Sequence, residues 1–324
     1  MTSTESLVLF DRVRFAYGDY VAVNESSFTV QRGTVFGLLG TNGAGKTTTL
    51  ELLQGFRSPV SGSVRVLGVD PVRDPGRVRR ATGVMLQEAG FFLNVTVERT
   101  LRLWSGLVDR RDDVGDVLAR VGLRDRADVP VQALSGGERR RLDVAVATWG
   151  SPELIVLDEP TTGLDPASRR LLWSHVRELR DQGSTVILTT HHLEEIEALA
   201  DTIAIMDRGD VVRSGPLASI LGSATASVTA RVSEQHAGAF SASKPHWLQV
   251  DVAPPLRSDP DQRWTISLRM DRQRHQDAVG WLITMSSARG IALDLLRATP
   301  GTLEDVFLAL QDESVARRVV EDAA

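Results

Sequence analysis

The stretch Gly40-Thr41-Asn42-Gly43-Ala44-Gly45-Lys46-Thr47 decides the fold, because it fits the phosphate-loop pattern G-x-x-x-x-G-K-[ST]. The apolar residues 35–39 before it predict a buried strand, and residues 48–54 after it predict a helix. A strand, a glycine loop and a helix in this order place backbone N–H groups and a helix N-terminus around phosphate oxygens. In such a loop Lys46 reaches the β- and γ-phosphates of a nucleotide, and the Thr47 hydroxyl binds Mg²⁺.

Lysine usage bears on the alternative, a glycine-rich turn that carries a lysine by chance. The chain has two lysines, Lys46 and Lys244, and otherwise uses arginine. One of the two stands where a compact point charge must meet phosphate. The sequence therefore favours a nucleotide site over a plain turn.

The composition excludes several classes of protein and site. With 324 residues, 42% hydrophobic and 24% charged, the chain is long enough for more than one domain and ordinary for a globular protein. The net charge of −5 gives no support to nucleic-acid binding, and the absence of cysteine excludes disulfides and thiolate metal sites. The N-terminus lacks a signal-peptide pattern, and no apolar run approaches the ~20 residues that cross a bilayer. We therefore expect a soluble chain whose membrane role, if any, comes through a partner.

Two further strands are predicted to end in polar residues. The buried run 154–157 ends in Asp158 and Glu159, and the run 185–190 ends at His191 and His192. Ligand chemistry lies at the carboxyl ends of parallel strands, so these side chains are expected near the phosphate loop. Because side chains alternate along a strand, one carboxylate is expected to hold Mg²⁺ and the other to polarise an attacking water. A lone histidine at a strand end is usually structural, but the shared sheet edge favours a contact with the γ-phosphate.

The segment Ser135-Gly136-Gly137 is predicted to open a helix. A capping serine and two glycines expose several backbone N–H groups there, which makes a second site suited to anions. A simple N-cap after a loop explains the same residues and, taken alone, is the better interpretation. The arginines at positions 139–141 are expected to form a solvated helix face.

The two tyrosines of the chain, Tyr17 and Tyr20, lie in the turn after a predicted strand over residues 7–15. A turn tyrosine near a phosphate loop can stack on a nucleotide base, and two half-buried turn aromatics are an equal alternative. Residues 26–30 and 34–39 are predicted strands joined by a hairpin turn at residues 31–33. Residues 88–151 show helical spacing, which predicts a helical insertion between two halves of an α/β sheet.

A second domain is predicted from residue 223 onward. Residues 226–232, 264–270 and 291–296 are predicted strands, residues 276–288 predict a helix, and Thr302 opens a capped last helix. Residues 236–263 are rich in proline and serine and are expected to be irregular. The prediction is a small α+β domain of order βαβα. It either supports dimerisation or regulation, or is a packing appendage without a ligand.

The order of the motifs resembles the nucleotide-binding subunit of an ATP-binding-cassette (ABC) transporter. Over residues 1–222 the chain carries a phosphate loop, a glutamine after a strand, Leu-Ser-Gly-Gly, a strand with Asp-Glu, Gly-Leu-Asp and a strand with His. Residues 302–308 and the run Arg-Arg-Arg-Leu at 139–142 resemble the daunorubicin-resistance (ABC-2) exporter type. The resemblance implies an α/β P-loop NTPase fold with a RecA-like core sheet, a β-subdomain and a helical subdomain at about residues 88–151. The α+β domain at residues 223–324 follows it.

The resemblance also implies roles in nucleotide binding. Tyr17, and not Tyr20, matches the aromatic residue that stacks on adenine. Asp165 matches a residue that contacts the opposite subunit of a dimer. His191 matches the switch histidine, because the family spacing after Thr-Thr favours it over the adjacent His192. The Walker A segment is matched by Gly40, Asn42, Gly43, Ala44, Gly45, Lys46, Thr47 and Thr48.

The remaining matches concern the metal, the reaction and the opposite subunit. Gln87 and Thr47 match residues at the Mg²⁺ ion, and Gln87 also relays to the membrane partner. Asp158 matches the Walker B aspartate for Mg²⁺, and Glu159 the general base. The segment Ser135, Gly136 and Gly137 matches the signature that contacts the γ-phosphate of ATP held by the opposite subunit. Glu138 departs from the pattern, since many members have glutamine or methionine there.

The resemblance thus implies an ATP-hydrolysing subunit that uses ATP and Mg²⁺. Two copies arranged head to tail would close around two ATP molecules on the cytoplasmic face of a membrane. A separate membrane-spanning permease would then export a drug-like or lipid-like substrate. The alternative is a soluble ABC-type ATPase that acts on ribosomes or DNA. The single phosphate loop and the absence of a long heptad run speak against it, and Glu159 disfavours a regulator that does not hydrolyse ATP.

Overall fold

The computed structural model describes residues 6–85, 90–255 and 263–310. The chain divides into two compact units, Met1–Leu217 and Ala218–Ala324, and each is described by itself. The sequence predicts a boundary after Gly222, five residues later than the division seen here. The residues between the two boundaries belong to one short helix, α8 (Leu217–Gly222). Within the described ranges, no helix combines the length and apolar character needed to cross a membrane.

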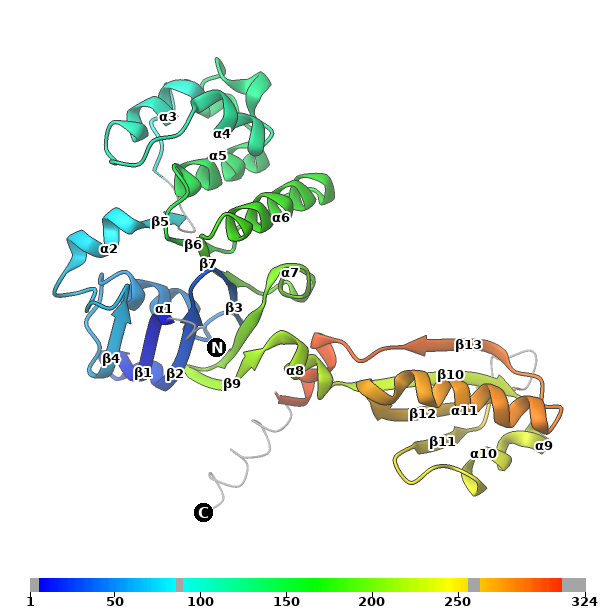
Figure 1. Cartoon of the computed structure of the whole chain (residues 1–324). Coiled ribbons are helices and arrows are strands. Elements are labelled where there is room, and N and C mark those ends of the chain that lie inside the picture. Colours follow the sequence, from blue (N-terminus) through cyan, green and yellow to red (C-terminus); the bar gives the residue numbers. More distant parts are fainter. Residues whose placement is uncertain (1–5, 86–89, 256–262, 311–324) are drawn as a thin grey trace. The chain divides into compact units, whose positions relative to one another are not determined.

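A six-stranded sheet of order β5-β6-β7-β3-β8-β9 forms the centre of the first unit (Figure 1). Its strands are β3 (Val35–Gly40), β5 (Thr82–Met85), β6 (Leu154–Asp158), β7 (Thr185–Thr190), β8 (Thr202–Asp207) and β9 (Asp210–Pro216). All neighbours are parallel except β8 and β9, which form an antiparallel hairpin. The register places Asp158 opposite Thr189 and Leu39 opposite Thr190, so β3, β6 and β7 end at one sheet edge.

A three-stranded antiparallel sheet of order β2-β1-β4 packs beside the central sheet. Its strands are β1 (Ser6–Tyr17), β2 (Tyr20–Gln31) and β4 (Ser61–Val66). The hairpin predicted at residues 31–33 is wrong, because β2 pairs with β1 while β3 pairs with β7 and β8. The burial patterns give the reason. Strand β2 is partly exposed along its length, whereas every residue of β3 is buried, which is typical of a central strand in a parallel sheet.

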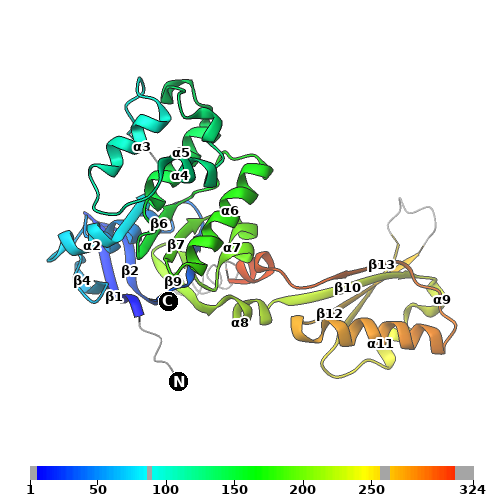
Figure 2. The ribbon, with the colours of Figure 1, turned by 45° about the horizontal axis from the view of Figure 1, so that its top comes forward.

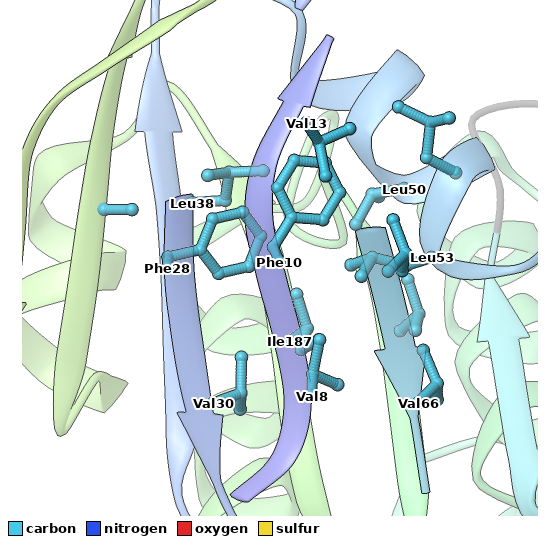
Figure 3. Packing of buried hydrophobic residues seen from close by; sticks show 14 of the residues in the cluster. Val8, Phe10, Val13, Phe28, Val30, Leu38, Leu50, Leu53, Val66 and Ile187 are labelled. Atoms are coloured by element: carbon cyan, nitrogen blue, oxygen red, sulfur yellow. The ribbon is translucent and has the colours of Figure 1, made fainter. Parts of the chain in front are cut away.

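The main core lies between the two sheets and includes helix α1 (Lys46–Leu53). The rings of Phe10 and Phe28 stack with centroids 4.8 Å apart, and Phe28 stacks on Phe36 at 5.1 Å. Figure 3 shows Leu50 and Leu53 of α1 close to these strands. Because α1 begins at Lys46, burial of its apolar side fixes the start of the helix against the sheets.

Helices α6 (Pro166–Asp181) and α7 (Leu193–Leu199) also pack on the central sheet. Glycine allows a close approach at Gly37, in the middle of β3. A Cβ atom there would lie 2.4 Å from the Cδ1 atom of Ile196 on α7. The small residue therefore lets α7 close onto the strand that leads into the phosphate loop.

A helical segment lies between β5 and β6, as predicted. It contains α3 (Val97–Ser105), α4 (Val114–Arg120) and α5 (Gly136–Thr148), which gather at one end of the unit (Figure 2). A shorter helix, α2 (Pro75–Ala81), precedes β5. Arg110 and Trp149 bond reciprocally, since each side chain donates to the other's backbone carbonyl at 3.1 Å and 3.0 Å. Arg110 also donates to the carbonyl of Arg80 at 2.7 Å, which ties the segment to α2.

The second unit is an antiparallel sheet of order β11-β12-β10-β13 with a core of its own. Its elements are β10 (Thr225–Val232), α9 (Glu234–Ala237), α10 (Ala239–Ala242), β11 (Gln249–Ala253), β12 (Trp264–Asp271), α11 (His275–Ala288) and β13 (Asp294–Thr299). The prediction that residues 236–263 are irregular is wrong, because β11 lies there. This strand has five residues and, within the described ranges, pairs with β12 alone. Its hydrophobic alternation is too short to be recognised in the sequence. Residues 303–310 are helical, and Thr302 and Asp305 form the expected cap.

Candidate functional site

The phosphate loop joins the end of β3 to the start of α1. Gly43 and Gly45 have φ angles of 81° and 100°, which strongly favour glycine. A Cβ atom on Gly45 would lie 2.3 Å from the backbone oxygen of Ala22. The loop is also braced by the β8–β9 turn, since the Gly209 N–H donates to the Ala44 carbonyl at 2.9 Å. The glycines therefore permit a backbone path that a side chain would block.

Lys46 is buried at the base of this loop, with 6% of its surface exposed. Its Nζ donates to the carbonyls of Gly40 at 2.8 Å and Thr41 at 3.1 Å. Burial lowers the pKa of the ammonium, and the nearby carboxylates of Glu159 and Asp158 act in the opposite direction. The loop thus holds a positive charge at its base. The N–H donors of the ammonium can leave these carbonyl oxygens and bind phosphate oxygens instead.

A cavity opens above the loop. The residues that line it are Tyr20, Ala22, Asn42, Gly43, Gly45, Lys46, Thr47, Thr48 and Glu159. The tyrosine at this cavity is Tyr20, whose hydroxyl lies 3.4 Å from the Gly43 carbonyl. Tyr17 instead donates to Glu51 on α1 at 3.0 Å, beneath the guanidinium of Arg57 at 5.2 Å from the ring centroid. The structure therefore places Tyr20 at the loop, while stacking of Tyr17 on adenine stays a prediction.

Asp158 ends β6 beside the loop and is almost completely buried, with 1% exposed. Its Oδ2 accepts from the Thr47 hydroxyl at 3.3 Å, and its Oδ1 accepts a short hydrogen bond from Thr189. Burial raises the pKa of this carboxyl, and the two hydroxyl donors lower it. The oxygens of Asp158 and Thr47 fit a Mg²⁺ ion, which prefers one or two such ligands completed by water and substrate phosphate.

Glu159 has a left-handed backbone, with φ of 49°. Its N–H donates to both the carbonyl and the hydroxyl of Thr189, at 3.0 Å and 3.1 Å. Its Oε1 lies 3.1 Å from Nδ1 of His191, and its Oε2 accepts from Thr162 at 3.3 Å. The rings of His191 and His192 are 4.1 Å apart. The structure thus brings together the carboxylate and the histidine that the sequence placed on two different strands.

Ser135 is the N-cap of α5 and forms a capping box with Glu138. The Ser135 hydroxyl accepts from the Glu138 N–H at 3.2 Å, and Glu138 accepts from the Ser135 N–H at 2.8 Å. The bond from the Ser135 N–H to the carboxylate is the main cause of a lowered pKa of Glu138, and the side chains of Arg126 and Ser135 lower it further. The segment Ser135–Gly137 is absent from the lining of the phosphate-loop cavity. The two predicted anion sites of one chain are therefore separate.

Asp165 and Gln87 complete the predicted set. Asp165 is the N-cap of α6 and accepts from the N–H groups of Ala167 and Ser168. The Ser168 hydroxyl is the main cause of a pKa of about 2 for this carboxyl. Asp165 thus stays ionised and holds a helix start within its own chain. Gln87 lies outside the described residues.

Sequence reasoning missed Arg140. The expectation that residues 139–141 form a solvated helix face is wrong for this residue and for Arg141. The Nη2 of Arg140 donates to the carbonyls of Asp158 at 2.5 Å and Glu159 at 2.6 Å. Arg141 donates to the Ser168 hydroxyl at 2.7 Å. Local spacing gives no signal for either contact, because both join segments that only the folded sheet brings together.

An apolar groove in the helical segment was also not predicted. It is lined by Val84, Met85, Gly90, Phe91, Phe92, Thr100, Leu103, Trp104, Leu107, Asp143 and Val146. Two of its apolar side chains are strongly exposed, Phe92 at 76% and Leu107 at 77%. Asp143 is the exception to its apolar character. The carboxyl is buried, and its Oδ1 has no hydrogen-bond partner among the described residues. Burial raises its pKa to about 6, against the attraction of Arg140 and Arg139.

Comparison with known proteins identifies relatives over most of the chain. The family model described as ABC transporter matches residues 23–162. The Nod factor export ATP-binding protein I of Ralstonia nicotianae is 41% identical over 208 residues, which cover 63% of this chain and 65% of the relative. The daunorubicin/doxorubicin resistance ATP-binding protein DrrA of Streptomyces peucetius is 34% identical over 315 residues, which cover 95% of this chain and 93% of the relative.

A solved structure supports the same relationship for the first two-thirds of the chain. It is described as the ATP binding subunit of an ABC transporter and has a TM-score of 0.62 at 26% identity. The match covers 66% of this chain and 91% of that structure, which confirms the predicted fold. The chain spans slightly less than two thirds of the length of the Ralstonia relative, at 65%, but nearly all of the Streptomyces relative, at 93%.

Proposed function

This chain belongs to the ABC transporter family, and from that membership we propose that it hydrolyses ATP to drive export through a separate membrane-spanning subunit. One observation carries the proposal. The buried Lys46, the carboxylates of Asp158 and Glu159, and His191 converge at one sheet edge beside a glycine loop. This set can bind a nucleoside triphosphate and activate a water molecule for attack on its γ-phosphate.

The phosphate loop binds the triphosphate. Its N–H groups and the start of α1 surround the phosphate oxygens, and Lys46 turns its donors from Gly40 and Thr41 toward the β- and γ-phosphates. Asp158 and Thr47 would hold Mg²⁺, and Gln87 would complete its protein contacts. When bound, Mg²⁺ neutralises charge on the phosphate oxygens.

Glu159 orients and deprotonates the attacking water. Its Oε1 lies next to His191 and its backbone is held on Thr189, so the carboxylate has a fixed direction. The water oxygen forms a bond to the γ-phosphorus, its proton passes to Glu159, and the bond to the bridging oxygen breaks to release ADP. His191 donates to the departing phosphate and keeps Glu159 in place.

Two copies of the chain complete the site. The separation of Ser135–Gly137 from the phosphate-loop cavity supports a head-to-tail dimer, in which each signature segment meets ATP on the opposite copy. Asp165 contacts the opposite copy along the same interface. Residues 223–324 support this dimer or regulate it. ATP then joins two half-sites, and hydrolysis releases them.

The apolar groove supports docking of a membrane-spanning partner. Its exposed aromatic and aliphatic side chains form a surface that a helix of a permease can cover. The chain then works at the cytoplasmic face of the membrane. The names of the relatives, which concern Nod factor export and daunorubicin resistance, favour a lipid-like or drug-like cargo.

Replacement of the predicted base tests the ATPase. We expect Glu159→Gln to lower ATP turnover at least about 100-fold while ATP binding persists, because the phosphate loop is unchanged. Phosphate release and binding of radiolabelled ATP are measured side by side. Glu194→Gln, an exposed carboxylate on α7, is the matched control and should retain wild-type turnover. Full turnover in Glu159→Gln would overturn the assignment of the base.

Purification from detergent-solubilised native membranes tests the transporter. We expect a membrane-spanning protein in near-equal amount, identified by its mass. Recovery with ribosomes or DNA instead would favour the second candidate, an ABC-type ATPase that acts on a non-membrane partner.

Two tyrosine variants identify the base-stacking residue. If Tyr17 stacks on adenine, Tyr17→Ala raises the KM for ATP about 5- to 150-fold, since stacking on a base contributes about 1–3 kcal/mol. Tyr20→Ala then leaves the KM nearly unchanged. The reverse outcome would assign the stacking role to Tyr20, the tyrosine that lines the cavity.

A further inference from the structure

Arg140 connects two parts of the first unit that the sequence separates. It lies on α5, which begins at the signature segment Ser135-Gly136-Gly137. Its guanidinium reaches the end of β6 and donates to the carbonyls of both Asp158 and Glu159. One nitrogen, Nη2, makes both contacts. An arginine side chain thus joins the signature helix directly to the backbone of the two site carboxylates.

Arg140 keeps its charge although its surroundings lower its pKa. Burial lowers the pKa of the guanidinium, while the carboxylates of Asp143, Asp158 and Glu159 raise it. An arginine remains protonated under such conditions, so its hydrogen bonds to the two carbonyls are charge-assisted. Such bonds are shorter and stronger than those between neutral groups, in agreement with distances of 2.5 Å and 2.6 Å.

The Glu159 backbone needs such support. A φ of 49° is unfavourable for a glutamate and persists only where the surroundings hold it. Thr189 holds the N–H side of the residue, and Arg140 holds its carbonyl side. Removal of the guanidinium would leave two carbonyls without this donor and would allow Glu159 to relax toward an extended backbone. The carboxylate would then move away from its direction beside His191.

We propose that Arg140 is a positioning residue that couples the signature segment to the base Glu159 of the same chain. The inference rests on the proposed function. When Ser135–Gly137 closes on ATP held by the opposite copy, α5 moves with it, and Arg140 transmits that movement to the carbonyl of Glu159. Each copy therefore orients its own base only when the nucleotide site of its partner is occupied. The two ATP sites of the dimer become cooperative through this contact.

Arg141 offers a matched control. It is the next residue on α5, has the same side chain, and also makes a hydrogen bond, but its partner is the Ser168 hydroxyl on α6. Its removal loosens the packing of α5 without touching the backbone of Asp158 or Glu159. A purely structural role for Arg140 would make the two arginines equivalent.

The test compares Arg140→Gln, Arg140→Lys and Arg141→Gln in the full chain, reconstituted with its membrane partner, over a range of ATP concentrations. For Arg140→Gln we expect kcat to fall about 10- to 100-fold, as for a sub-ångström to 1 Å displacement of a catalytic group. The KM for ATP should stay within about twofold, and the Hill coefficient should fall from near 2 to 1. Arg140→Lys keeps a positive donor and should recover part of both kcat and the Hill coefficient. Arg141→Gln should retain the wild-type Hill coefficient.

Two outcomes would overturn the coupling role. One is wild-type kcat and cooperativity in Arg140→Gln, and the other is the same loss in Arg141→Gln. If Arg140→Gln does not fold, the comparison of Arg140→Lys with Arg141→Gln decides by the Hill coefficient alone. An inactive wild-type chain would overturn the proposed function itself, which distinguishes that failure from a failure of the coupling.

Discussion

The first unit has a buried carboxylate at the phosphate loop, Asp158, and another in the apolar groove, Asp143. Burial disfavours the ionised form of both side chains, but their hydrogen-bond partners differ. The two residues are 1% and 8% exposed, and burial raises the pKa of both. Asp158 accepts from Thr47 and Thr189 and lies near Lys46. The Oδ1 of Asp143 has no hydrogen-bond partner among the described residues. The contrast teaches that burial alone does not mark a candidate site carboxylate, whereas convergent donors from several elements do.

Replacement of each carboxylate by its amide should give the largest difference in ATP turnover between the two regions. We expect Asp158→Asn to lower ATP turnover at least about 100-fold, because the charge that would face a bound Mg²⁺ is lost. Asp143→Asn should retain turnover within about threefold, since Asp143 does not line the phosphate-loop cavity and its interaction with Arg140 is electrostatic. ATPase rates across a Mg²⁺ titration measure both effects. Similar losses in the two variants would show that the distinction between the regions is false.

The stability that the protein gains from Asp143→Asn should depend on pH. The folded-state pKa of Asp143 is about 6, above the ordinary value of 3.8, so the folded chain binds the proton more tightly. The ionised carboxylate therefore lowers stability progressively as pH rises from about 4 to about 6, and fully above that. Removal of the charge should stabilise the first unit by about 1–2 kcal/mol at pH 7.5. This is less than the full linkage value, because a buried amide also lacks partners.

Thermal melts of wild type and Asp143→Asn at several pH values check this prediction. The gain should be clearly smaller at pH 5 than at pH 7.5. The exposed Asp109→Asn is a suitable control, with no change expected at either pH. A gain that is independent of pH would mean that the stabilisation comes from packing and not from the charge.

An exposed polar group should show the smallest effect. Ser135 caps α5 at the surface, where water can replace its hydroxyl. Ser135→Ala should therefore cost only about 1 kcal/mol of stability. Ser135→Thr, which keeps a hydroxyl, should cost less. Denaturation by urea measures both costs. A cost as large as that of a buried charge would contradict the view that water replaces the lost hydroxyl.

Local patterns predicted the parts of the site that are contiguous in sequence. The strand, glycine loop and helix around Lys46, the capping serine at Ser135 and the carboxylates at the end of β6 each lie within one short segment. The convergence of the phosphate loop, Asp158 and Glu159 with His191 followed from the rule that parallel strands end at one sheet edge. The family and fold predictions rested on the order of these segments, and the comparisons confirmed both.

The failures concern contacts between distant segments. A turn at residues 31–33 looks like a hairpin because local sequence does not say that β3 belongs to another sheet. Arg140 looks solvated because its partners lie at the end of β6, and the burial of Asp143 was not predicted. The tyrosines are three positions apart, and only the folded turn shows which one reaches the loop. The roles of all the site residues in nucleotide binding and hydrolysis, Gln87 and Asp165 included, remain predictions.

The place of β3 in the central sheet has a consequence for synthesis of the protein. Its neighbours β7 and β8 begin at Thr185 and Thr202, long after the phosphate loop at Gly40–Thr47 has left the ribosome. At about 5–20 residues per second, the interval until β7 is made is roughly 7–30 s. The local sheet β2-β1-β4 can form during that time, but the apolar strand β3 must wait without neighbours, open to chaperones and to aggregation. A nascent chain that stops before Thr185 carries the whole phosphate-loop motif but lacks β7 and β8, the two strands that pair with β3.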